Sequence, residues 1–228
     1  MSAARMTGEV ETALAAAAIP RDRWGNERTR RLGGGERLLY QWILRSFAAG
    51  AVPEADALAA AAAGFDLDVE QALATLARED LVHRDPATGA ILIAYPFSAK
   101  PRGHRVLING ARWVEAMCAI DALGIAPMLN LPVEVVSRDP LSGGEVWVRI
   151  DPGDGAWWEP SAAVVLAASA CCAGPSFRSC CDLLNFFEAG EHALRYLVAH
   201  PEITGHAISL PQAIEAGATV FANALKEV

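Results

Sequence analysis

The sequence predicts an α+β protein, in which a winged-helix-like three-helix module precedes a mixed-sheet domain with flanking helices. Two patterns lead to this prediction. Apolar residues recur at helical spacing in successive segments of the first third of the chain, whereas apolar and polar residues alternate, as in strands, around 133–150. The 228 residues, 53% of them hydrophobic, suffice to bury one or two cores. We expect an extension and linker over 1–35, the module over 36–100 and the second domain over 101–228.

The composition excludes several classes of protein. A net charge of −8 and a pI near 5.1 argue against generic nucleic-acid binding, and the apolar content excludes a disordered chain. The longest uncharged stretch, 160–177, falls short of the roughly 20 apolar residues of a membrane-spanning helix. Residues 13–19 imitate a signal-peptide core, but Glu9 and Glu11 stand where positive charges are expected. We therefore expect a cytoplasmic protein without a membrane segment.

The first part of the chain is expected to be mainly helical. An alanine-rich helix within 1–35 should end in a flexible linker at the three glycines 33–35. Apolar spacing then predicts three helices, and Asp66 or Asp68 is expected to cap the third. These helices are expected near 36–50, 54–63 and 69–81. The turn chemistry of 85–89 predicts a hairpin, which completes the winged-helix-like module.

Charge argues against DNA binding by this module. Residues 36–95 carry nine acidic and four basic side chains, a net charge of −5. The segment in the position of a recognition helix carries several acidic residues and a single base, Arg78. Such a surface would repel the phosphates that supply most non-specific affinity for DNA. We therefore expect a structural module and no nucleic-acid partner.

The second part alternates helical and extended patterns. Residues 133–137 and 145–150 alternate about a turn and predict a second hairpin. The remaining elements are expected as a helix over 113–129, strands over 162–170, 181–187 and near Ile208, and closing helices over 190–200 and 211–225.

Cys118 and Asp121 are the first candidates for chemistry. They stand three residues apart on a predicted helix, which places them on one face, a turn apart. Burial would raise the pKa of the carboxyl group and let it hold a proton near neutrality, as a general acid must. The alternative is structural: a buried cysteine packs as a small hydrophobic residue, and Asp121 caps the helix or forms a salt bridge.

A second thiol strengthens the chemical interpretation. Cys180 and Cys181 are expected to enter a strand, so that only one of them points inward. Two sulfurs and one carboxyl group make a poor zinc site but suit a soft metal of low coordination number. The five histidines show no ligand spacing, and the pair Cys171 and Cys172 precedes a Gly-Pro break, as in a loop. Five cysteines with paired neighbours do not predict a disulfide framework.

Three segments resemble the alkylmercury (organomercurial) lyase family. Segment 118–123 (Cys-Ala-Ile-Asp-Ala-Leu) resembles its catalytic helix, and 179–181 (Ser-Cys-Cys) followed by 185–187 (Asn-Phe-Phe) resembles its second cysteine segment. The stretch 192–222 is similar to its closing helix–strand–helix. The resemblance covers roughly residues 36–226 and would make 101–228 the catalytic domain.

The resemblance implies protonolysis of a carbon–mercury bond, giving a hydrocarbon and Hg(II) held by two cysteines. Cys118 matches the first mercury-binding cysteine, and Asp121 matches the carboxyl group that handles the proton and contacts the metal. Cys181 matches the second cysteine if the Phe-Phe pair sets the register, with Cys180 as the fallback. The resemblance implies a small organomercurial substrate, no cofactor, glutathione or cysteine as co-reactant thiols, and hand-off of mercury to a mercuric reductase.

Two alternatives use the same thiols without this reaction. A non-catalytic protein for binding or sensing soft metals such as Hg or Cu would hold the ion through Cys118 and Cys181 and release no hydrocarbon. A thiol redox enzyme would form a reversible disulfide. One departure from the family is Asp182, where Cys or Ser commonly follows the second cysteine. Its carboxylate would raise the thiol pKa if it faced the site, although strand alternation is expected to turn it away.

Overall fold

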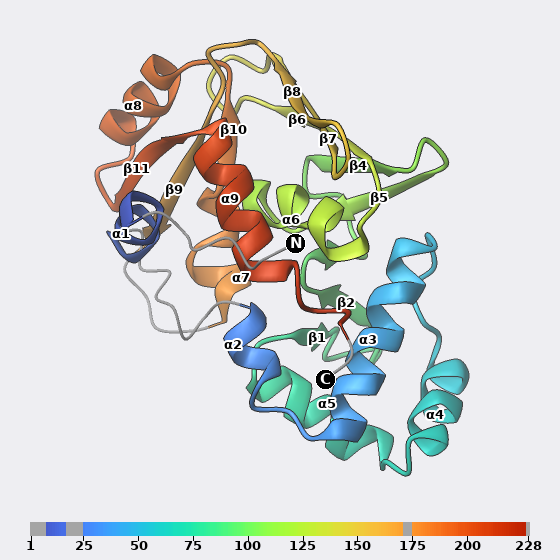
Figure 1. The fold of residues 1–228 in the computed structure, drawn as a ribbon. Helices are drawn as coiled ribbons and strands as arrows, with labels where there is room; N and C mark the ends of the chain where they lie inside the picture. The colour runs from blue at the N-terminus through green and yellow to red at the C-terminus, as the bar shows by residue number, and fades with distance from the viewer. Residues whose placement is uncertain (1–7, 17–24, 171–174, 227–228) are drawn as a thin grey trace.

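The computed structural model describes residues 8–16, 25–170 and 175–226. The protein is a mixed α+β fold with an eight-stranded sheet, a three-stranded sheet and helices that pack against them (Figure 1). The strand order is β1-β2-β3-β5-β4-β6-β7-β8 in the large sheet and β10-β9-β11 in the small one. All of these pairings are antiparallel, so the predicted mixed sheet is wrong. Short turns join most neighbouring strands of the large sheet, and parallel pairing would need long crossover connections. Within the described ranges, no helix is both long and apolar enough to cross a membrane.

The first half of the chain begins with helices and ends with short strands. They are α1 (Gly8–Ala16), α2 (Gly25–Thr29), α3 (Gly34–Ala48), α4 (Ala55–Gly64), α5 (Val69–Arg78), β1 (Val82–Arg84), β2 (Ile91–Ala94), β3 (Phe97–Ser98), β4 (His104–Ile108) and β5 (Arg112–Ala116). The second half alternates. It holds α6 (Ala119–Leu129), β6 (Val133–Arg138), β7 (Glu145–Asp151), β8 (Gly155–Glu159), β9 (Val164–Ala170), α7 (Ser176–Ser179), a 3-10 turn (Cys181–Leu183), β10 (Asn185–Phe187), α8 (Gly190–Ala199), β11 (Ile203–Ser209) and α9 (Leu210–Phe221).

Helices α3, α4 and α5 pack together beside the β1–β2 hairpin, as the apolar spacing predicts (Figure 1). Leu39, Leu76 and Leu81 are fully buried there. Of the two candidate caps, Asp68 is the N-cap of α5, and its side chain accepts the backbone N–H of Gln71. The hairpin continues through β3 into β5, so the segments 36–100 and 101–228 contribute to one sheet.

The predicted glycine linker at 33–35 is wrong. Gly34 and Gly35 form the first turn of α3. A Cβ atom on Gly35 would lie 2.9 Å from Cδ2 of Leu67 and 3.3 Å from the carbonyl oxygen of Phe65. Gly35 therefore permits a close approach of α3 to the α4–α5 connection. In the sequence alone, a glycine required for such packing looks the same as a glycine of a flexible linker.

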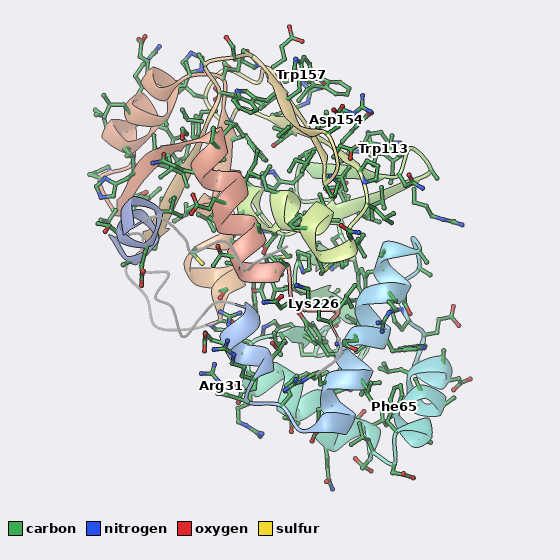
Figure 2. All side chains as sticks on the ribbon, in the orientation of Figure 1. Arg31, Phe65, Trp113, Asp154, Trp157 and Lys226 are labelled. Atoms are coloured by element: carbon green, nitrogen blue, oxygen red, sulfur yellow. The ribbon has the colours of Figure 1, made fainter. Side chains whose placement is uncertain are left out.

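The helix predicted over 113–129 begins later, because 112–116 form β5. This strand pairs with both β3 and β4, and Trp113 stands on the exposed face of the sheet under the guanidinium of Arg105 (Figure 2). Burial in this short strand increases from exposed Arg112 to buried Ala116 without alternating, so the segment carries no strand period in its sequence. The correction makes Cys118 the N-cap of α6 instead of an interior helical residue.

Helix α6 is the central element of the core. It lies between the inner face of the large sheet and α9, and nearly all of its residues are buried. Two glycines allow α6 and α9 to approach closely: Cβ atoms on Gly124 or Gly217 would lie 3.1 and 2.8 Å from backbone atoms of the other helix. This packing fixes the N-terminus of α6 in a dry interior.

Candidate active site

Cys118 and Asp121 interact directly at the start of α6. The Cys118 thiol donates a hydrogen bond to Oδ2 of Asp121 over 3.1 Å, and its sulfur accepts the backbone N–H of Asp121 over 3.4 Å. Cys118 is 1% exposed and Asp121 is 5% exposed. The sequence prediction that these two side chains share a face is confirmed, although Cys118 caps the helix and does not lie within it.

The second thiol of the site comes from the segment after α7. The strand expected over 181–187 is wrong for its first part, since Cys181–Leu183 form a 3-10 turn and only Asn185–Phe187 are strand. Both Cys180 and Cys181 are buried, so strand alternation does not choose between them. The sulfurs of Cys118 and Cys181 and a carboxylate oxygen of Asp121 all lie within 4.8 Å of one another.

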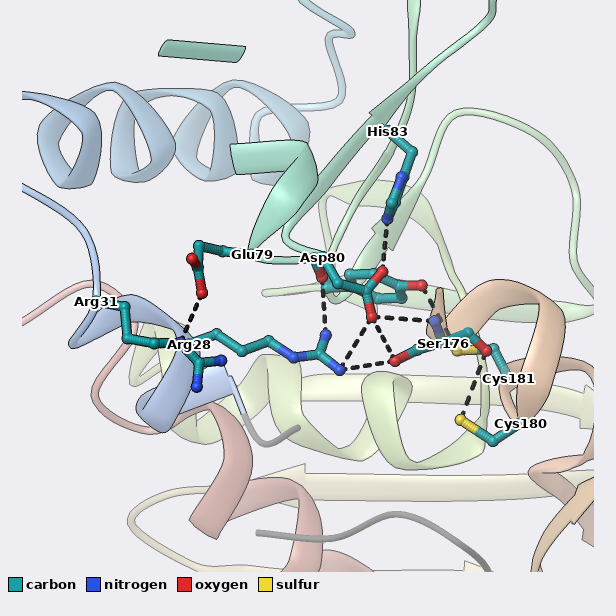
Figure 3. Close-up of polar contacts among 9 residues, drawn as sticks. Arg28, Arg31, Glu79, Asp80, His83, Ser176, Cys180 and Cys181 are labelled. Atoms are coloured by element: carbon teal, nitrogen blue, oxygen red, sulfur yellow. Dashed lines mark hydrogen bonds and ion pairs between the residues drawn. The ribbon is translucent and has the colours of Figure 1, made fainter. Parts of the chain in front are cut away.

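Cys180 makes a different contact. Its thiol donates to the backbone carbonyl of Ser176 over 3.5 Å (Figure 3). Cys181 donates to the hydroxyl oxygen of Tyr95 over 3.9 Å. The group within 4.8 Å therefore consists of Cys118, Asp121 and Cys181. A hydrogen bond between the side chains of Cys180 and Cys181 places the fallback Cys180 next to this group. Cys171 and Cys172 lie outside the described residues.

One backbone contact links the two cysteine segments. The N–H of Ala119 donates to the carbonyl of Leu184 over 2.8 Å. Phe186 and Phe187 follow in β10 and are completely buried, which anchors this segment against β9. Residues far apart in the sequence thus bring both thiols to one place.

Burial controls the protonation of the three groups. It raises the pKa of Cys118 to about 12 and that of Asp121 to about 7, the latter against the lowering effects of the Cys118 hydrogen bond and the charge of Arg28. A hydrogen bond to Cys118 and burial raise the pKa of Cys181 well above its usual value. Near neutral pH both thiols are therefore protonated, and Asp121 exchanges its proton readily. The site offers two soft sulfur ligands and an acid in a dry interior.

Asp182 does not face the thiols. Its side chain is largely exposed and forms an ion pair with Arg102. The expectation that it turns away is confirmed, but the reason is the 3-10 turn and the partner arginine, and not strand alternation.

Sequence reasoning missed the residues that surround Cys181. Tyr95, Arg28, Asp80 and Ser176 come from four separate segments, and no spacing in the sequence relates them. It also missed a cluster of Asp139, Glu188 and His192, in which Nδ1 of His192 lies 2.6 Å from Oδ2 of Asp139. The sequence feature that could have indicated this cluster is the i,i+4 spacing of Glu188 and His192 across the start of α8.

The chain resembles known proteins over the part that contains the site. A family model described as alkylmercury lyase (MerB) matches residues 97–222. A curated alkylmercury lyase from Staphylococcus epidermidis is 26% identical over 172 residues, which cover 74% of this chain and 77% of that protein. A crystal structure of the mercury-bound form of MerB2 matches with a TM-score of 0.74 and 20% identity, covering 94% of this chain and 100% of that one. The family match spans Cys118, Asp121 and Cys181.

Proposed function

The chain belongs to the alkylmercury lyase family, and from this premise we propose that Cys118, Cys181 and Asp121 carry out its reaction. The protein is an organomercurial lyase, an enzyme that cleaves carbon–mercury bonds. The observation that supports these residue assignments is their convergence: two thiols and one carboxyl group of raised pKa, from separate segments, lie within 4.8 Å of one another in a buried site.

The reaction begins with exchange of thiols on mercury. The substrate R–Hg–SR′, where R′SH is a small thiol, passes R–Hg⁺ to the sulfur of Cys118 and releases R′SH, which carries away the Cys118 proton. Cys181 then binds the same mercury through its sulfur and gives its proton to Asp121, which enters this step as the carboxylate. Asp121 protonates the carbon, and the electron pair of the carbon–mercury bond forms the new carbon–hydrogen bond. The products are RH and Hg(II) held by two sulfurs.

The environment of the site favours each part of this scheme. Two thiolates donate electron density through mercury to the leaving carbon, which weakens the bond before the proton arrives. Burial prevents water from competing for the metal and lets Asp121 retain a proton near pH 7. General acid catalysis of this kind typically contributes about 10²–10⁴-fold. Weakening of the carbon–mercury bond by the two sulfurs supplies the remaining rate enhancement.

The remaining proposals concern what the enzyme uses and where it acts. No cofactor is required, because the two sulfurs and the carboxyl group supply every atom that the reaction consumes. Glutathione or cysteine delivers the substrate, and a mercuric reductase receives the Hg(II). These partners, like the lyase reaction itself, fit a cytoplasmic protein.

We also propose that the three helices and the hairpin of segment 36–100 form a winged-helix-like module with a structural role. Segment 1–35 would be an extension, and 101–228 the catalytic domain. The net charge of −5 over 36–95 opposes contact with phosphates. A mobility shift with duplex DNA at low salt would contradict this part of the proposal.

Release of hydrocarbon tests the assignment. Purified protein is given phenylmercury with an excess of small thiol, and benzene is measured by gas chromatography. Cys118→Ala and Cys181→Ala should each abolish release, while Cys180→Ala should retain it. Full activity of Cys181→Ala together with loss in Cys180→Ala would reverse the choice of second ligand. Binding of mercury without benzene release by the unmodified protein would instead support a soft-metal binding protein.

A further inference from the structure

A buried ion pair connects three distant parts of the chain beside the active site (Figure 3). Arg28 in α2 places Nη2 3.0 Å from Oδ2 of Asp80, which follows α5, and donates to Oγ of Ser176 at the start of α7 over 2.7 Å. Its other terminal nitrogen, Nη1, donates to the backbone carbonyl of Asp80 over 2.7 Å. The Arg28 side chain is 7% exposed and that of Asp80 is 18% exposed.

The donor and acceptor roles in the hydrogen bonds among Arg28, Asp80 and Ser176 are fixed by their chemistry. Oδ2 of Asp80 accepts both the backbone N–H and the hydroxyl of Ser176, over 3.0 and 2.7 Å. The Ser176 hydroxyl therefore donates to Asp80 while it accepts from Arg28. Oδ1 of Asp80 lies 2.6 Å from Nε2 of His83, which fixes the carboxylate from its other side. Ser176 is thus held in position and in orientation.

The position of Ser176 determines the course of the chain to Cys181. The carbonyl of Ser176 accepts the N–H and the thiol of Cys180, over 3.0 and 3.5 Å. The next residue is Cys181, whose thiol contacts the hydroxyl of Tyr95. The Arg28 guanidinium also lies 5.8 Å from the centre of the Tyr95 ring. One side chain from the N-terminal part of the protein thus contacts both the segment that carries Cys181 and the ring beside it.

We propose that Arg28 is a positioning residue for the reaction: with Asp80 and Ser176 it holds the Cys181 thiol where it can share a mercury ion with Cys118. The inference rests on the proposed role of Cys181 as the second mercury ligand. It gives the segment before residue 36 a part in the chemistry, although that segment lies outside the matched family span. Cys118 is held by hydrogen bonds at the start of α6 that do not involve Arg28. The first thiol exchange is therefore expected not to depend on Arg28.

The proposal therefore predicts a specific kinetic defect. Without the Arg28 contacts, the enzyme should still take up the organomercurial on Cys118, but Cys181 should reach the metal less often. Cleavage should slow while KM changes little. Misplacement of a reacting group by about 1 Å can cost on the order of 10²-fold in rate, so we expect a fall in kcat of about this size.

Four variants of the full chain test this. Arg28→Met removes the contacts and Arg28→Lys keeps the charge without the planar fork, while Ser176→Ala removes a single hydroxyl and leaves the ion pair intact. Arg31→Met is the matched control, because Arg31 forms a neighbouring ion pair with Glu79 and does not contact Ser176 (Figure 3). Benzene release from phenylmercury gives kcat and KM, and thiol titration after one equivalent of Hg(II) gives the number of sulfurs that each ion protects.

Arg28→Met should lower kcat strongly at nearly constant KM and protect one thiol per ion where the unmodified protein protects two. Ser176→Ala should show a smaller defect of the same kind, Arg28→Lys should recover part of the rate, and Arg31→Met should behave like the unmodified protein. Unchanged kcat and two protected thiols in Arg28→Met would overturn the inference; if that variant does not fold, the same result in Ser176→Ala would overturn it. Failure of the proposed function would appear differently, as no benzene release by the unmodified protein.

Discussion

The sulfur of Cys118 lies 3.1 Å from Oδ2 of Asp121, and the backbone N–H of Asp121 points at the same sulfur. One helical turn therefore holds both the proposed metal ligand and the proposed acid. The N-terminus of a helix favours negative charge, so in the proposed reaction it would stabilise the sulfur of Cys118 as the proton leaves and mercury binds. The local geometry of α6 would thus couple metal capture to proton transfer.

Replacement of Asp121 by Asn should make stability less dependent on pH. The pKa of Asp121 is about 7 in the folded protein, against 3.8 ordinarily. Between these values the unfolded chain ionises while the folded protein does not, so the unmodified protein loses stability as pH rises, by about 1.4 kcal/mol per pH unit. The amide of the variant does not ionise and carries no such cost, so the stability advantage of Asp121→Asn should grow from pH 4 to pH 8. Urea denaturation across this range measures it.

The same variant should lose hydrocarbon release by about 10²–10⁴-fold, because an amide side chain cannot supply the proton. Hg(II) binding should persist, since both sulfurs remain. For the stability prediction above, a difference in free energy of unfolding between Asp121→Asn and the unmodified protein that stays constant from pH 4 to pH 8 would contradict the raised pKa of Asp121.

Replacement of Gly217 by Ala should push α9 away from α6. The added Cβ would lie 2.8 Å from the backbone nitrogen of Gly124 and 3.0 Å from the carbonyl oxygen of Ile120, and neither backbone atom can rotate away. We expect the free energy of unfolding to fall by roughly 1–3 kcal/mol. Gly64→Ala at the end of α4 is the control, because its Cβ meets nothing within 4 Å. Equal stability of the two variants in urea would show that the α6–α9 contact is less close than described.

Asp139 should stabilise the β6–β7 turn against the start of α8. Its carboxylate accepts the N–H groups of Leu141 and Glu188 and contacts Nδ1 of His192. Burial opposes the charge, but these hydrogen bonds outweigh it and lower the pKa of Asp139. A lowered pKa adds stability above the ordinary value of an aspartate, and this stability disappears as pH falls through the folded value. Asp139→Asn should therefore cost about 1–3 kcal/mol at pH 7 and progressively less in acid.

The control for Asp139 is Asp85→Asn. The carboxylate of Asp85 accepts the N–H groups of Ala87 and Thr88 in the corresponding turn of the first hairpin. Its described interaction beyond this hairpin is the charge of Lys100, whereas Asp139 accepts a hydrogen bond from Glu188. Urea denaturation at pH 7 and pH 3 compares the two variants. If Asp139→Asn lowers the free energy of unfolding no more than Asp85→Asn does, the contacts of Asp139 with Glu188 and His192 do not have the proposed role.

The sequence predicts much of the fold because local patterns determine the helices and hairpins. Apolar spacing locates α3, α4 and α5, and alternation locates β6 and β7. The patterns fail where long-range contacts decide the conformation. The short strand β5 depends on pairing with β3 and β4, and the helical conformation at Gly35 goes with its packing against Leu67. Neither kind of contact leaves a periodic signal in the sequence.

The candidate site is likewise only partly predictable from the sequence. Cys118 and Asp121 are predictable because they are neighbours on one element, and the Phe-Phe register favours Cys181. The residues that position Cys181 are not predictable, because Arg28, Asp80 and Ser176 are separated by 52 and 96 positions along the chain. The expectation that strand alternation turns only one of Cys180 and Cys181 inward is wrong, since Cys181 begins a 3-10 turn and both are buried.

A single turnover in D₂O tests the central claim most directly. Excess protein equilibrated in D₂O carries deuterium on Cys118, Cys181 and Asp121, and it is mixed with phenylmercury before the vapour is analysed by mass spectrometry. The proposed reaction predicts one monodeuterated benzene for each mercury retained by the protein, and retention without benzene in Asp121→Asn. Stoichiometric mercury binding by the unmodified protein with no deuterated benzene released would contradict it.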